Sequence, residues 1–139
     1  AFEVIERDGI RYAEILRSDV SADRTTFFSP AASSLQFGLL AHEAGFVEPA
    51  HNHRAHSRHI ADMQQMFVVQ RGIVAVDFFL EMGEKFHEVI LHRGDAILLV
   101  HGAHAIRVLE DMQCIGVKQG PFLGESEDKV FLPTHGATP

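Results

Sequence analysis

The order of apolar and polar residues predicts a chain of short β-strands. Apolar side chains alternate with polar ones or form short runs, and glycine, proline or polar pairs interrupt them roughly every ten residues. No segment sustains the helical spacing of three and four residues. After a hairpin over residues 3–17, strands are expected over residues 25–28, 35–41, 65–69, 73–80, 86–91, 96–100, 105–109, 112–117 and 130–132. This pattern favours an all-β sandwich or barrel.

Four local signals predict turns, and a fifth predicts a loop. Asp8–Gly9 is a strong two-residue hairpin signal between two apolar runs. Gln70 to Gly72 and Glu110–Asp111 each predict a turn between consecutive strands, and Arg93 to Asp95 predicts a turn before a buried strand. The acidic run Glu125 to Asp128 is expected to lie in a loop near the end of the chain.

Composition indicates one ordinary globular domain over residues 1–139, with a frayed tail at 133–139. The formal net charge of -7 argues against nucleic acid and anionic membranes as main partners. The apolar runs are also too short to span a membrane. Cys114 is the only cysteine, so no intramolecular disulfide forms, and it is expected to act as a small buried hydrophobe. With no basic and apolar leader at the start, these features predict a cytoplasmic location.

The positions of the histidines along the chain indicate a metal-binding site. Of ten histidines, six lie in two segments, His51 to His59 and His101 to His104. Residues two apart in a strand face the same way, so His51 and His53 are expected to point into one pocket, where paired imidazoles suit a transition metal. The alternative is a solvated histidine-rich loop that holds nothing.

Other residues near these histidines have a functional and a plainer interpretation. His101 suits a general base near neutral pH, or it is a turn residue. Arg54 and Arg58 suit binding of a carboxylate or phosphate from a lid, or they are solvent-exposed. Tyr12, the only tyrosine, is expected to pack in the core or at an edge.

At this point the residues resemble the cupin superfamily. Gly45, five residues, His51–Asn52–His53, then Gln65, six residues and Gly72 follow the first cupin motif, with eleven residues between His53 and Gln65 and a glutamine at the glutamate position. Gly94–Asp95, a buried strand and His104 follow the second motif. The resemblance covers about residues 35–118, and the closing VKQGPF stretch is similar to a group of small cupin-like proteins.

This resemblance implies a fold and a ligand set. The fold is a single-domain double-stranded β-helix, a jelly-roll barrel, with the leading hairpin exchanged or packed across a homodimer. The implied site is one divalent transition metal, iron, zinc, manganese or nickel, with iron or zinc favoured. The implied ligands are His51, His53, Gln65 and His104, with His56, His59 or His101 as possible substitutes for Gln65. Alternatively, Gln65 orients a ligand imidazole or a bound water without contacting the metal.

The expected function is that of a metal-dependent enzyme acting on a small polar or anionic metabolite. The reaction implied by the resemblance is isomerisation or epimerisation of a sugar-like substrate, or iron-dependent dioxygenation. A non-catalytic small-molecule or metal-binding protein, a sensor or storage module, is the alternative, and the neutral Gln65 supports it. A barrel without metal is a third possibility, because one fold hosts many functions.

Overall fold

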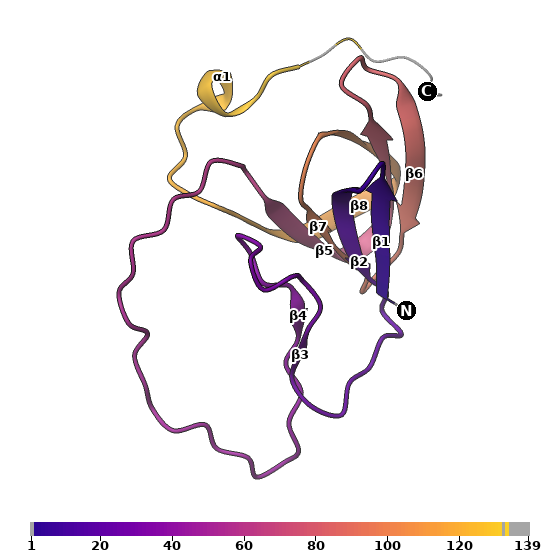
Figure 1. Cartoon of the computed structure of the whole chain (residues 1–139). Helices are drawn as coiled ribbons and strands as arrows, with labels where there is room; N and C mark the ends of the chain where they lie inside the picture. Colours follow the sequence, from indigo (N-terminus) through magenta and orange to yellow (C-terminus); the bar gives the residue numbers. More distant parts are fainter. Residues whose placement is uncertain (1, 132, 134–139) are drawn as a thin grey trace.

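The structure is a computed structural model that describes residues 2–131 and 133. In this part of the chain every regular element except one short helix is a strand (Figure 1). The elements are β1 (Phe2–Arg7), β2 (Ile10–Leu16), β3 (Thr26–Phe27), β4 (Gly38–Leu39), β5 (Gln65–Phe79), β6 (Lys85–Leu91), β7 (Ala96–Leu99), β8 (Ala103–Lys118) and α1 (Glu125–Asp128). The all-β expectation is confirmed.

The leading hairpin forms where the sequence predicted it. β1 and β2 are antiparallel, and Asp8 and Gly9 both have positive φ, 53° and 77°. A two-residue hairpin turn with positive φ at both positions matches the right-handed twist of its strands, and Asp-Gly is well suited to it. β2 then pairs with β7 of the same chain, which joins the hairpin to the main sheet.

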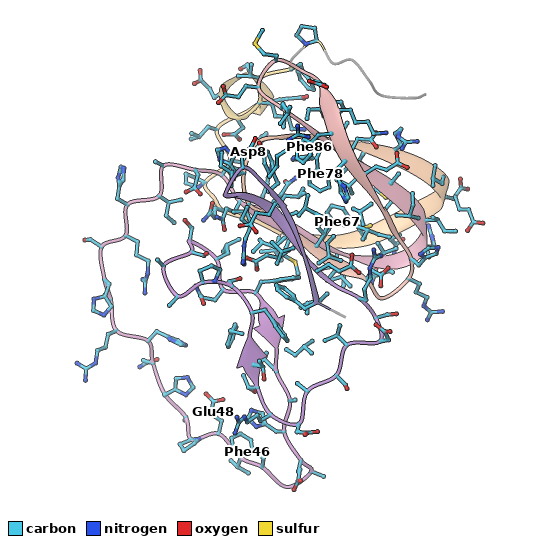
Figure 2. The ribbon with its side chains drawn as sticks, turned by 45° about the vertical axis from the view of Figure 1, so that its right-hand side comes forward. Asp8, Phe46, Glu48, Phe67, Phe78 and Phe86 are labelled. Carbon is cyan, nitrogen blue, oxygen red and sulfur yellow. The ribbon has the colours of Figure 1, made fainter. Side chains whose placement is uncertain are left out.

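One sheet dominates the molecule, with the order β1-β2-β7-β5-β6 and β8 paired to β5. The first part of β5 pairs with β7 and the second part with β6, while β8 follows nearly the whole length of β5 on its other side. The sheet is strongly curled into a half-barrel (Figure 1). Figure 2 shows Phe67, Phe78 and Phe86 within this curl, where they belong to the main hydrophobic cluster.

The turns predicted at Gln70 to Gly72 and at Glu110–Asp111 are wrong. The chain continues through both positions as the single strands β5 and β8, and the pairing register shifts between Val69 and Val74. Gly72 has φ 88°, and a Cβ built there would overlap the carbonyl oxygen of Asp111. A glycine with positive φ occurs in a β-bulge as well as in a turn. The sequence therefore indicated a special backbone conformation at Gly72 correctly, but the conformation belongs to a bulge and not to a turn.

Residues 40–64 form no strand and extend as a wide arc outside the sheet (Figure 1). The strand expected over residues 35–41 is reduced to β4, which pairs with β3. The acidic run Glu125 to Asp128 forms α1 where a loop was expected. Val130 and Phe131 are not in a strand, while Leu132 and the expected frayed tail, apart from residue 133, lie outside the described residues.

A buried ionic network stabilises the second half of the β5–β8 pair. Asp77 on β5 is 1% exposed and accepts two hydrogen bonds from Arg107 of β8, at 2.7 and 3.0 Å. Lys85 lies 3.1 Å from the same carboxylate, and Glu88 pairs with both cations at the surface. Asp77 precedes Phe78 of the main cluster, so its side chain lies on the opposite face of the strand.

Asp95 stabilises the turn before β7. Its carboxylate accepts hydrogen bonds from the backbone N–H groups of Ser18 and His92, each at 2.8 Å, and from the Arg17 guanidinium at 3.3 Å. Asp95 is 4% exposed, so these donors compensate the cost of its burial. The Gly94–Asp95 motif therefore fixes β7 against the end of β2.

Candidate functional site

The curl of the sheet brings Gln65 and His104 together. In the β5–β8 register Gln65 lies opposite Lys118, whereas His104 lies opposite Phe78 near the other end of the ribbon. Nevertheless Nε2 of Gln65 lies 3.3 Å from Nε2 of His104. A strongly twisted and coiled sheet can bring the two ends of a long strand pair to the same point.

The pKa of His104 is lowered, which favours the neutral imidazole. Burial is the main cause that lowers its pKa, and the positive charge of Lys129 lowers it further. Because Nε2 of Gln65 is an amide nitrogen and can only donate, His104 accepts through Nε2 in this contact. A neutral imidazole is the form that binds a metal or accepts a proton, and Nε2 of His104 becomes free for either when Gln65 turns away.

A hollow of about 400 Å³ opens beside Gln65, and His104 adjoins it through its contact with Gln65. Gln65 lines it together with Phe67 of β5 and Ile106, Cys114 and Lys118 of β8. The wall is mostly apolar, with a few polar groups at the Gln65 end. This combination of size and lining is typical of sites that bind small molecules.

Cys114 lies in the wall of the hollow, half-buried and in contact with the main hydrophobic cluster. Burial raises the pKa of its thiol, so the reactive thiolate is disfavoured. Its Sγ lies 3.7 Å from Sδ of Met112. The expected role of Cys114 as a small hydrophobe agrees with these contacts, although its burial is incomplete.

His51 and His53 lie together, but away from this hollow. Their ring centroids are 5.2 Å apart, and His51 also contacts the Glu48 carboxylate at 3.2 Å and the Pro49 carbonyl oxygen at 2.9 Å. Figure 2 shows Glu48 at the opposite end of the molecule from Phe67 and Phe78. The expectation that a strand carries the two histidines is wrong for this structure, because residues 40–64 pair with no strand.

The rest of the histidine-rich segment is exposed along the same arc. It contains the remaining predicted site residues of this region, Arg54, His56, Arg58 and His59. The four proposed metal ligands therefore form two separate pairs, His51 with His53 and Gln65 with His104. Residues 2–131 and 133 contain no group of three or more His, Cys, Asp or Glu side chains arranged to hold a metal. The chemistry of the donors suits a transition metal, but their arrangement does not assemble the site.

His101 lies against the leading hairpin. Its ring is 5.7 Å from the ring of Tyr12, and its backbone N–H donates to the Tyr12 carbonyl oxygen at 3.3 Å. Tyr12 is 6% exposed, as expected for a packed residue. Gly102 allows this packing, because a Cβ there would meet the Tyr12 ring at 2.6 Å. In the described part of the chain no hydrogen bond or ring contact joins His101 to His104 or Gln65.

The sequence alone did not identify two features of the site. Lys118 lies beside Gln65 only because of the β5–β8 register, which no local signal specifies. Next to this pair, the backbone N–H of Gln64 donates to Oε1 of Gln119 at 2.9 Å. Gln64 is 3% exposed, and its Oε1 and Nε2 of Gln119 are buried without a hydrogen-bond partner among the described residues.

A second and larger hollow, of about 530 Å³, lies between the β3–β4 ribbon and the sheet. Its walls are mainly apolar, and none of the predicted metal ligands lines it. Arg17 reaches it, but its guanidinium is engaged by Glu3 at 2.7 Å and by Asp95 at 3.3 Å. The hollow beside Gln65 and His104 is therefore the candidate functional site.

The fold and this hollow define a class: a small all-β protein with a curled antiparallel half-barrel and a polar pair that joins the two ends of the β5–β8 ribbon. Comparison with protein-family models, curated proteins and solved structures finds no match for the chain. In the described residues, no helix is long and apolar enough to cross a membrane.

Proposed function

We propose that the chain is a cupin-type protein that binds a small, polar and anionic metabolite in the hollow beside Gln65 and His104. The observation that carries this proposal is the 3.3 Å contact between those two side chains, which come from opposite ends of the β5–β8 ribbon. They are also two of the four residues that the cupin resemblance assigns to the metal. A neutral His104 and a mostly apolar wall are consistent with a ligand site.

The proposal includes one divalent transition metal, held by His51, His53, Gln65 and His104. It requires residues 40–64 to fold back over the hollow. Two apolar surfaces of the chain support this movement: Val47, Ile60 and Met63 are exposed on the arc, and Ile106 and Val108 are exposed on β8. Among the described residues β8 pairs only with β5, so its other edge is open to a further strand. Joining these surfaces would bury apolar area and complete the edge.

When bound, such a metal would supply either Lewis-acid assistance or oxygen chemistry. Iron would favour dioxygenation, and zinc or manganese would favour isomerisation or epimerisation of a sugar-like substrate. The residues of the hollow would bind and orient the metabolite in either case.

A second candidate, non-catalytic binding of a small molecule or metal, has its own support. Gln65 replaces a carboxylate, and His101, the expected base, packs against Tyr12. In the described residues no contact places a general base beside the Gln65–His104 pair. Binding without turnover of oxygen-rich metabolites would favour this sensor or storage function.

The first test is elemental analysis of untagged protein purified without added metal or chelator. About one transition-metal ion per chain is expected by the proposal, and its loss in a H51A/H104A double variant that stays folded would support the ligand set. The matched control is H87A/H92A, which removes two other exposed histidines. Protein that is metal-free and also refuses added iron, zinc, manganese and nickel would overturn the metal proposal. Sedimentation in the same buffer would test the expected homodimer.

A further inference from the structure

Lys118 is the only charged residue among those that line the hollow. It is directly opposite Gln65 in the β5–β8 register, and directly opposite residues project from the same face of a sheet. Its ammonium group lies 5.1 Å from the centroid of the Phe122 ring. A cation above an aromatic face is stabilised, but its N–H donors remain available for an acceptor.

Within the described part of the chain, Lys118 has no carboxylate partner. The chain has three lysines, Lys85, Lys118 and Lys129. Lys85 is paired with Asp77 and Glu88, at 3.1 and 2.6 Å. In residues 2–131 and 133, neither Lys118 nor Lys129 has a carboxylate within ion-pair distance. In a chain with a net charge of -7, two unpaired ammonium groups near one site are unexpected.

Lys129 is a second cation in this part of the molecule. It follows α1, and its charge is close enough to His104 to be felt by the imidazole. Of these two cations, Lys118 of β8 is the one that lines the hollow beside Gln65. A cation in the wall of a small hollow favours an oxyanion, because carboxylate and phosphate oxygens accept charge-assisted hydrogen bonds.

We infer that Lys118 binds the oxyanion of a small organic acid or phosphate, so that the rest of the metabolite lies against Gln65 and the apolar wall of the hollow. This inference deepens the proposed function and rests on it, since it takes the same hollow as the metabolite site. Lys118 would determine specificity by selecting anions. The volume of about 400 Å³ suits a metabolite-sized ligand.

The test is a calorimetric titration of the protein with malonate and, separately, with inorganic phosphate. Protein as purified and protein treated with chelator are both titrated. The variants are Lys118→Met, which keeps the aliphatic stem, and Lys118→Arg, which keeps the charge. Arg24→Met is the matched control, because it removes one positive charge from an exposed position that does not line the hollow.

Lys118→Met is expected to weaken binding of the preferred anion about tenfold or more, the size of a charge-assisted hydrogen bond. The anion affinities of Lys118→Arg and Arg24→Met should stay within about threefold of the wild-type affinity. The reason is that the charge beside the bound anion, and not the net charge of the chain, determines the affinity. Tighter binding of malonate identifies a carboxylate ligand, and tighter binding of phosphate identifies a phosphorylated one. If Lys118→Met does not fold, Lys118→Gln replaces it.

Three results would overturn the inference: no binding of either anion to the wild type, equal affinities for the wild type and Lys118→Met, or an equal loss in Arg24→Met. The inference and the metal proposal fail separately. Anion binding that depends on Lys118 in a protein that never takes up metal would support the inference alone. Metal bound through His51 and His104, with anion binding indifferent to Lys118, would remove the inference and leave the metal proposal intact.

Discussion

Replacing Asp77 with Asn would test how the half-barrel is stabilised. The carboxylate is 1% exposed and accepts both hydrogen bonds of the Arg107 fork, with Lys85 at 3.1 Å. Asn keeps the shape but removes the charge, so two cations lose their buried partner. Removing one member of a buried pair costs about 3–5 kcal/mol. Because the side chain of Arg107 is 28% exposed and can regain water, we expect the lower end, about 3 kcal/mol.

Urea denaturation measures this loss in the free energy of unfolding. Urea is uncharged, so it does not screen the charges of the network. The expected result is a lower midpoint with an unchanged slope, and a melting temperature lower by about 10 °C for a chain of this size. Glu88→Gln is the control: it removes a carboxylate from the same network at a side chain that is 46% exposed, and should cost less than about 1 kcal/mol. Equal midpoints for Asp77→Asn and the wild type would refute the reasoning, as would an equal loss in Glu88→Gln.

The effect also has a predicted pH dependence. The hydrogen bonds from Arg107 are the main cause that holds the pKa of Asp77 below its ordinary value of 3.8. Below that value the unfolded chain takes up the proton before the folded chain does, so acid removes the stabilisation. The difference between wild type and Asp77→Asn should be complete above about pH 5 and shrink as the pH falls through 4 and below. A difference that stays constant down to pH 2 would contradict the assigned cause.

Three further changes have defined outcomes. Gly72→Ala should destabilise the chain by about 3 kcal/mol in urea, because its φ of 88° and the nearby β8 carbonyl exclude a Cβ; a neutral result would mean that the bulge relaxes freely. Ser29→Ala should cost about 2 kcal/mol, because its hydroxyl donates to buried Glu14 at 2.7 Å, and an unchanged urea midpoint would argue against that role. In chelator-treated protein, NMR titration should give His104 a pKa below 6.5 that rises in Lys129→Met, and no rise would contradict the proximity of Lys129.

Much of the fold follows from local signals in the sequence. Asp8–Gly9 specifies its hairpin because few residue pairs accept positive φ twice. The apolar run before Val100 became the buried strand β7, as its composition predicted. The bulge at Gly72 was mistaken for a turn because both use a glycine with positive φ, and only the partner strand distinguishes them.

The candidate site, like the fold, was predicted only in part from the sequence. The cupin-like spacing singled out Gln65 and His104, and the structure brings these two together. His51 and His53 were expected on a strand, but a strand needs a partner for its backbone hydrogen bonds, and residues 40–64 have none. The roles of Arg54 and Arg58 stay predictions, because they lie on the same exposed arc.

The sequence by itself determined the strand class, the leading hairpin, the buried strands and the residue types available for a site, because these depend on neighbours along the chain. Only the tertiary structure decided that β5 and β8 run unbroken past each other, that their curl joins Gln65 to His104, and that Lys118 lies beside them. The physical reason is that register and curl depend on pairing between distant segments. No window of sequence contains both partners of such a pair.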